Sequence, residues 1–203
     1  KNKTQIRWRF SHMMERTLVL IKPDGVQRSL TGRILTRFED IGLKVVGMKM
    51  VWSDDKMAET HYAFTDEWAN SLFERVKSTK EKNKEPFPFT SAKEYGLMIQ
   101  RWNKDYLTRG PIVAIVLEGS HAVELVRKHI GHTEPRQALP GTIRGDFTVD
   151  SYYNSDVGQR SIYNLVHASG TANEANREIA LWFNPKELHS YKNLHDHAGI
   201  ATK

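Results

Sequence analysis

The chain has 203 residues, and its hydrophobic fraction of 39% suits one globular domain with a proper core. Of its 30 Lys and Arg, four (Lys1, Lys3, Arg7 and Arg9) precede the first acid, Glu15, and removing them lowers the net charge from +6 to +2. A nearly neutral body argues against nucleic-acid binding, no apolar run approaches the roughly 20 residues of a membrane span, and zero cysteines fit a reducing cytoplasm.

The N-terminal arm resembles expression-vector sequence. Ser11, His12 and Met13 stand directly before a second methionine, Met14, as a cloning site stands before a natural start. We therefore expect residues 1–13 to be a tag or cloning remnant and residues 14–203 to form a single domain.

The apolar pattern predicts a β-α-β start. Residues 17–21 are an apolar run typical of a strand. Apolar residues then recur at helical spacing over 34–41 and stop at Gly42, a helix-ending signal, and residues 43–52 alternate as a half-buried strand does.

Between residues 53 and 109 the pattern favours helices. Ser53 or Asp54 can cap a helix that runs through Tyr62. Two further apolar stripes have helical spacing, and a Pro-rich break at 85–89 separates them. We expect an inserted helical hairpin over about 68–109, whose stripes are Trp68, Leu72, Phe73 and Val76, then Tyr95, Ile99, Trp102 and Tyr106.

The second half of the chain predicts the rest of a sheet. Residues 111–117 are predicted to be a buried strand, and Ser120 is predicted to cap a helix that ends at Gly131. Residues 147–152 are predicted to begin the last strand region, and residues 161–166 have strand character. A capping box at 171–174 begins a helix that runs to Phe183. The order of elements indicates an α+β fold, a ferredoxin-like antiparallel sheet with helices on one face.

The most informative polar residue is His167, which lies where an apolar run meets a new helix. Eleven residues later Glu178 lies at the edge of that helix's apolar stripe. A neutral imidazole becomes a nucleophile when a hydrogen bond to one nitrogen fixes the tautomer and aims the other. Glu178 or a backbone carbonyl could supply this bond. A single histidine at such a place more often only packs, so the other residues decide.

Basic and polar residues fall at the ends of several elements. Lys22 follows the first strand, Arg127 lies on the helix after Ser120, and Thr133 and Arg144 lie in a Pro- and Gly-rich loop. Each alone would be ordinary surface solvation. Together they predict a phosphate cradle, because guanidinium groups suit phosphate oxygens.

Four motifs, long and in order, give the chain a resemblance that covers residues 14 to about 191. It resembles the nucleoside diphosphate kinase family in Glu15-Arg-Thr-Leu-Val-Leu-Ile-Lys22-Pro-Asp-Gly-Val-Gln-Arg28, Gly141-Thr-Ile-Arg-Gly-Asp-Phe147, Asn164-Leu-Val-His167-Ala-Ser169 and Glu178-Ile-Ala-Leu-Trp-Phe183. The resemblance implies that a nucleoside triphosphate gives its γ-phosphoryl group to His167 and that a nucleoside diphosphate then collects it.

The same resemblance implies roles for further residues. Lys22 would contact the transferring phosphate and a sugar hydroxyl, Tyr62 would lie near the γ-phosphate, and Asn164 would bind the sugar 3′-hydroxyl. Arg127, Thr133 and Arg144 would hold the phosphates, and Ser169 and Glu178 would position His167. Mg²⁺ would be carried by the nucleotide phosphates, not by a protein cage. A cytoplasmic homohexamer built from dimers is also implied.

The chain departs from the family pattern in three places. Ala168-Ser169-Gly170-Thr171 replaces the usual Gly-Ser-Asp-Ser, about thirty extra residues lie between Tyr62 and Gly110, and about ten, including 151–160, precede His167. Within the first of these insertions Trp68 could stack on the nucleobase or anchor the core of the hairpin. The base preference is not readable from the sequence.

Two other functions remain open. A ferredoxin-like RNA-binding module would need a basic strip and exposed strand aromatics, which the chain lacks. A catalytically inactive family member acting as a scaffold is conceivable because Gly170 and both insertions alter the surroundings of His167. The presence of Lys22, Arg127, Arg144 and Asn164 argues against it.

Overall fold

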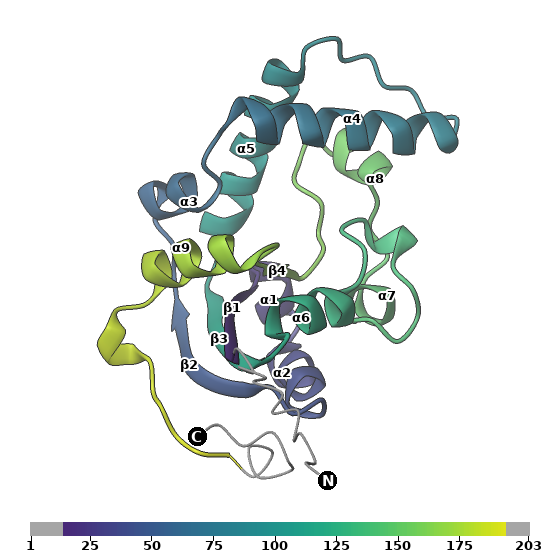
Figure 1. Cartoon of the computed structure of the whole chain (residues 1–203). Coiled ribbons are helices and arrows are strands. Elements are labelled where there is room, and N and C mark those ends of the chain that lie inside the picture. The colour runs from purple at the N-terminus through teal and green to yellow at the C-terminus, as the bar shows by residue number, and fades with distance from the viewer. Residues whose placement is uncertain (1–13, 194–203) are drawn as a thin grey trace, which may run out of the picture.

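The computed structural model describes residues 14–193, so the predicted tag at 1–13 lies outside the described residues. Its centre is a four-stranded antiparallel sheet with the order β2-β3-β1-β4 (Figure 1). The strands are β1 (Met14–Ile21), β2 (Lys44–Val51), β3 (Ile112–Ser120) and β4 (Val166–Ala168). The α+β antiparallel class is confirmed.

Helices cover both faces of this sheet. Successive side chains of a strand point to opposite faces, and Val19 and Ile21 of β1 join a different cluster from Leu18 and Leu20. The first cluster includes residues of α2 (Thr31–Glu39) and α6 (Ala122–Ile130), and the second includes residues of α3 (Asp55–His61), α5 (Ala92–Thr108) and α9 (Ala172–Trp182). The prediction of helices on one face is therefore corrected, because the apolar stripes of α3, α5 and α9 need burial too.

The two helices predicted in the hairpin are present. They are α4 (Asp66–Lys82) and α5, and α4 lies at the end of the molecule away from the sheet (Figure 1). Their apolar stripes share a small cluster with Tyr152 that is separate from both sheet clusters. The C-terminal part of α5 reaches the sheet through Leu107. The hairpin is thus fixed at one end to the sheet and forms its own core at the other.

Several boundaries differ from the predictions. Residues 147–152 are not a strand: α7 (Ile143–Phe147) and α8 (Tyr152–Val157) flank an extended link in which Val149 is 91% exposed. Of the residues predicted to have strand character, 161–166, only Val166 is in a strand, as the first residue of β4. His121, not Ser120, is at the N-cap position of α6, and its side chain makes no capping hydrogen bond. Three short elements complete the chain: α1 (Pro23–Gln27), η1 (Pro135–Gln137) and η2 (Pro185–Glu187).

The beginning of α9 agrees with the predicted cap at Thr171. Thr171 Oγ1 accepts a hydrogen bond from the backbone N–H of Glu174 at 3.1 Å. The Glu174 carboxylate, however, accepts from the N–H of Gly170 at 2.8 Å, one residue before the position that a capping box requires. Within the described residues, no helix is both long and apolar enough to span a bilayer.

Candidate active site

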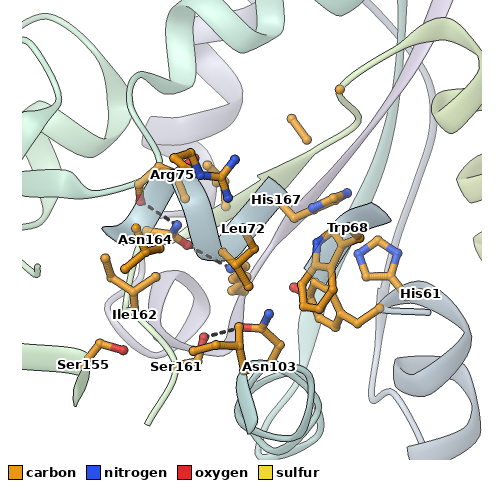
Figure 2. Close-up of a pocket in the computed structure, with 18 of the residues that line it drawn as sticks. His61, Trp68, Leu72, Arg75, Asn103, Ser155, Ser161, Ile162, Asn164 and His167 are labelled. Atoms are coloured by element: carbon orange, nitrogen blue, oxygen red, sulfur yellow. Dashed lines mark hydrogen bonds between the residues drawn. The ribbon is translucent and has the colours of Figure 1, made fainter. Parts of the chain in front are cut away.

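A cavity of about 700 Å³ lies between the hairpin, α8 and the end of the sheet that carries β4 (Figure 2). Nine of the ten residues predicted for the site line it: Lys22, Tyr62, Trp68, Arg127, Thr133, Arg144, Asn164, His167 and Glu178. Ser169 is fully buried and lies behind Glu178. The structure therefore brings all ten predicted residues together.

His167 is held by a carboxylate. It is the middle residue of β4, opposite Leu20 of β1, and its Nε2 lies 3.0 Å from both carboxylate oxygens of Glu178. A carboxylate in this geometry accepts, so Nε2 carries the proton and Nδ1 keeps its lone pair. Within residues 14–193 no partner is found for Nδ1. The ring thus presents an unprotonated nitrogen to the cavity.

Glu178 is itself fixed from behind. It is 1% exposed, and Ser169 Oγ donates a hydrogen bond to its Oε2 at 2.6 Å. Burial raises the pKa of Glu178, whereas burial and then the charge of Lys22 lower the pKa of His167 to about 3. His167 is therefore neutral across the physiological pH range, as a nucleophile must be.

A second histidine, His61, packs on the first. Its position next to Tyr62 is the one sequence feature that could have drawn attention to it. Its ring lies 4.4 Å from the His167 ring, edge to face. Trp182 Nε1 donates to His61 Nδ1 at 3.2 Å, so the remaining proton is on Nε2. Burial and the neighbouring His167 keep the pKa of His61 well below its usual value.

His61, His167 and Glu178 offer three possible metal ligand atoms within 4.8 Å of one another. Two of the three are imidazoles, whereas Mg²⁺ prefers oxygen ligands. The cluster is therefore a poor site for a magnesium ion.

Lys22 and Asn164 form a polar pair in the cavity wall. Lys22 Nζ donates to Asn164 Oδ1 at 2.8 Å, and Asn164 Nδ2 donates to the carbonyl of Thr133 at 2.9 Å. Burial, followed by repulsion from Arg144, lowers the pKa of Lys22 to about 7. An incoming anion would restore the charge of this ammonium.

The two arginines predicted for the site, Arg127 and Arg144, differ in how firmly their side chains are held. Arg144 is buried and donates to three backbone carbonyls, those of Asn164 at 3.1 Å, Gly131 at 3.0 Å and Val166 at 2.8 Å. It therefore shapes the cavity wall while keeping two N–H groups to offer. Arg127, near the end of α6, is exposed and is free to turn toward a ligand.

Asp24, which the sequence analysis did not single out, fixes the backbone beside this wall. Leu165 has φ +67°, a left-handed conformation that is costly for a leucine. Its N–H lies 3.3 Å from Asp24 Oδ2, and its carbonyl accepts from the Lys22 N–H at 2.8 Å. These contacts fix the backbone of Leu165 and thereby the directions of its neighbours Asn164 and Val166.

Tyr62 and Trp68 lie on the side of the cavity formed by α3 and α4. The Tyr62 ring is 6.3 Å from the His167 ring, and burial raises the pKa of its hydroxyl. Trp68 lines the cavity and also packs against the cluster of the hairpin, so its packing role is observed and its stacking on a base stays a prediction.

Gly170 lies where the chain departs from the pattern Gly-Ser-Asp-Ser that the resemblance led us to expect, and Glu174 occupies the space beside it. A Cβ on Gly170 would lie 2.8 Å from Glu174 Oε2. The Glu174 carboxylate thus takes the space that a larger side chain at 170 would need, and it supplies negative charge near the start of α9.

Comparison with known proteins agrees with this geometry. The family model described as nucleoside diphosphate kinase matches residues 15–84 and 92–188. The chain belongs to the nucleoside diphosphate kinase family. The seven residues between the two matched segments, 85–91, lie in the link between α4 and α5.

Individual relatives are similar over most of their length. A nucleoside diphosphate kinase from Pyrococcus furiosus is 44% identical over 178 residues, which are 88% of each chain. One from Pyrobaculum aerophilum is 42% identical over 179 residues, 86% of this chain and 98% of the relative.

Two solved structures have the same fold. The crystal structure of an NDP kinase from Pyrobaculum aerophilum has a TM-score of 0.82 and 38% identity, covering 88% of this chain and 100% of that one. A transition-state mimic of the kinase from Borrelia burgdorferi, with bound vanadate and ADP, has a TM-score of 0.76 and 35% identity, covering 92% of this chain and 96% of that one.

Proposed function

We propose that this protein is a nucleoside diphosphate kinase that transfers the γ-phosphoryl group of a nucleoside triphosphate to a nucleoside diphosphate through His167. One observation carries the proposal: Glu178 binds Nε2, so the unprotonated Nδ1 faces a cavity lined by Lys22, Arg127 and Arg144. A neutral, oriented nucleophile among cations is what phosphoryl transfer requires.

The reaction follows from this arrangement in two balanced steps. The lone pair of His167 Nδ1 forms a bond to the γ-phosphorus, and the bond from that phosphorus to the β,γ-bridging oxygen breaks, releasing the diphosphate. The ring then carries a positive charge, which the Glu178 carboxylate stabilises through Nε2–H. In the second step a terminal oxygen of another diphosphate attacks the phosphorus, and the imidazole leaves in its neutral form.

The other residues bind and orient. Lys22, Arg127 and Arg144 would balance the charge that spreads over the phosphoryl oxygens, and Thr133 would hold the phosphates. Asn164 and Lys22 would bind the sugar hydroxyl, Tyr62 would lie beside the γ-phosphate, and Trp68 would stack on the base. Ser169 would keep Glu178 aligned, as a group that orients a catalytic residue does.

The carboxylates of the cavity wall bear on the role of magnesium. Glu174, Glu178 and Asp156 line the cavity, and each already accepts a hydrogen bond or ion pair, from Gly170, Ser169 and Lys80 respectively. The described wall therefore suits Mg²⁺ that arrives on the nucleotide phosphates, where it would neutralise charge on the β- and γ-oxygens.

The assembly and location are part of the same proposal. We expect a homo-oligomer, a hexamer built from dimers, located in the cytoplasm and using nucleoside tri- and diphosphates as substrates. A reducing compartment is compatible with a chain that has no cysteine.

The decisive test is labelling with ATP carrying a labelled γ-phosphate, in the presence of Mg²⁺. The protein should acquire an acid-labile, alkali-stable label, added diphosphate should remove it, and His167→Ala should not be labelled. Label on the His167→Ala variant would end the assignment of this residue.

A further inference from the structure

Lys22 is a buried amine without an anionic partner. It is 6% exposed, and over residues 14–193 its Nζ makes one hydrogen bond, to Asn164 Oδ1 at 2.8 Å, and no ion pair with a carboxylate. Burial and the charge of Arg144 both disfavour its charged form. The charged form, which a phosphate would need, therefore depends on the other groups that surround this side chain.

An aromatic ring lies beside this amine. Lys22 Nζ lies over the ring of Tyr106, 5.1 Å from its centroid. The negative face of an aromatic ring attracts a cation within about 6 Å of the centroid. Tyr106 is 3% exposed and lies near the C-terminal end of α5, which runs from the hairpin toward the sheet (Figure 1). The hairpin thus contributes a side chain that faces a predicted site residue.

The Tyr106 ring is held in place by a stack of neighbours. The ring of Tyr163 lies 5.2 Å from it at an interplanar angle of 34°, and the Arg109 guanidinium lies over both rings, at 5.0 Å from Tyr106 and 4.4 Å from Tyr163. Arg109 also donates to the Tyr163 hydroxyl at 2.6 Å. This stack leaves the Tyr106 ring little freedom to turn away from Lys22.

We propose that Tyr106 is a positioning residue, whose ring face stabilises the charged form of Lys22 and holds its ammonium where a phosphate can reach it. The inference rests on the proposed function, in which Lys22 contacts the transferring phosphate. An ammonium has three N–H groups. Asn164 accepts from one of them and the ring attracts the ammonium from another side, which leaves an N–H for a phosphate oxygen.

Charged or titratable groups of four other elements also face Lys22, namely Asp24 of α1, His61 of α3, Arg144 of α7 and His167 of β4. Both histidines are neutral above pH 7, because burial holds their pKa values well below the usual range. Arg144 keeps its charge, since burial lowers its pKa only to about 10. Burial also raises the pKa of the Tyr106 hydroxyl well above its ordinary value. Among these basic groups and the hydroxyl, Lys22 is therefore the one that changes its charge between pH 7 and pH 9.

The position of the alkaline limb of kcat/KM tests the inference. Tyr106→Leu removes the ring face, which lowers the pKa of Lys22, so the limb should move to lower pH by about 0.5 to 1.5 units. At pH 8 the same shift lowers kcat/KM by about 3- to 30-fold. Tyr106→Phe keeps the face and should keep the limb of the unchanged protein. A purely structural role would lower the rates at every pH without moving the limb.

Two further variants show whether the effect passes through Lys22. Phe73→Leu removes another buried ring from the hairpin, in the cluster of α4 and α5, and should leave the limb in place. Lys22→Met has no ammonium, so adding Tyr106→Leu to it should leave kcat/KM at pH 8 within about twofold of the single Lys22→Met variant. A full effect of Tyr106→Leu in the absence of Lys22 would overturn the inference.

The remaining outcomes are equally direct. A Tyr106→Leu protein with an unmoved limb would contradict the proposed role, and so would a Tyr106→Phe protein shifted as far as the leucine variant. If Tyr106→Leu does not fold, proton NMR of the unchanged protein replaces it. The ε-methylene protons of Lys22, identified by their loss in Lys22→Met, should be shifted upfield by the ring, and ordinary shifts would exclude the contact.

Calorimetric titration with ADP separates this inference from the proposed function, because binding needs no phosphoryl transfer. The affinity of the unphosphorylated protein for ADP should fall as the pH rises from 7 to 9, and Tyr106→Leu should move that fall to lower pH. If no transfer occurs but this shift is found, the kinase proposal fails and the role of Tyr106 stands. If transfer occurs and neither the limb nor the ADP affinity responds to Tyr106→Leu, the kinase proposal stands and the role of Tyr106 fails.

Discussion

At the scale of single residues, the site depends on burial, which shifts the pKa values of neighbouring basic and acidic groups in opposite directions. Burial lowers the pKa of His167 to about 3 and that of Lys22 to about 7, while it raises the pKa of Glu178. All three shifts favour neutral groups before a ligand enters. The charge of a bound nucleotide therefore has a large effect on Lys22, the group with a pKa near neutrality.

A pH dependence follows for the free protein. Lys22 is charged below its pKa of about 7 and loses its charge as the pH rises above it, so kcat/KM for the nucleotide should fall on the alkaline side. His167 stays neutral down to about pH 3, so its protonation should cause no loss at pH 5. Initial rates between pH 5 and pH 9 show whether kcat/KM falls on the alkaline side and stays level on the acid side.

The profile of kcat provides the control for this assignment. Bound phosphates raise the pKa of Lys22, so the alkaline limb of kcat should lie at higher pH than that of kcat/KM. Identical limbs in the two profiles would mean that another group is responsible.

The hydrogen bond between Glu178 and His167 allows a sharper test. Glu178→Gln keeps the size of the side chain but removes the anion that stabilises the charged ring, so phosphoryl transfer should slow by roughly 10- to 100-fold. Because Glu178 touches no substrate in the proposed arrangement, KM should change little. Steady-state rates measure both constants.

The matched variant is Glu81→Gln on the exposed face of α4, which should behave as the unchanged protein does. A Glu178→Gln variant with normal turnover would reduce Glu178 to a packing role.

At the scale of elements, prediction from sequence succeeded where apolar periodicity was long. The strand at 17–21, the helix around Ile34 and Phe38 and the cap at Thr171 all reappear, because one face of each element must be buried. The alternation of apolar and polar residues over 147–152 covers only six residues, which is too short to establish a strand. Their structure is set by Asp150, whose buried carboxylate binds Arg160 and the N–H of Tyr163, a long-range contact that local pattern does not reveal.

The residues of the candidate site also divide into those that the sequence identified and those that it did not. The sequence identified the residues whose side chains carry chemistry, such as His167, because their motifs are specific. It did not identify His61 and Asp24, whose roles depend on contacts with residues more than one hundred positions away. Such contacts become visible only when α1, α3 and the last third of the chain are folded together.

One element-scale contact joins the hairpin to α8. Lys80 of α4 is buried, and its Nζ lies 2.5 Å from Asp156 of α8 and 3.6 Å from Glu85. Asp156→Asn removes the nearer anion from a buried ammonium, and we expect a loss of about 1–3 kcal/mol in the free energy of unfolding, since Asp156 is partly exposed. Urea titration measures it.

Asp55→Asn is the matched control. Asp55 also pairs with a lysine, Lys104, but at 3.6 Å and with a 74% exposed side chain, so its loss should shift the urea midpoint much less. Equal shifts for the two variants would show that burial of Lys80 adds nothing.

At the scale of the whole molecule, one edge of the sheet exposes a row of apolar side chains. The strand β2 is an edge strand, and Met48, Met50 and Trp52, on one side of it, are 53%, 64% and 65% exposed. A single exposed apolar residue is ordinary, but a row of three along an edge strand is typical of an interface. This edge supports the proposed homo-oligomer and lies opposite β4, which carries His167.

Met50→Lys tests that edge. A charge placed in the row would have to be buried without a partner, so the oligomer should dissociate, and light scattering should report a smaller mass than for the unchanged protein. Phosphorylation of His167 should persist, because the cavity is built from residues at the other edge. Val149→Lys, at an isolated site that is 91% exposed, should leave the mass unchanged. A Met50→Lys protein of unaltered mass would place the interface on another face of the molecule.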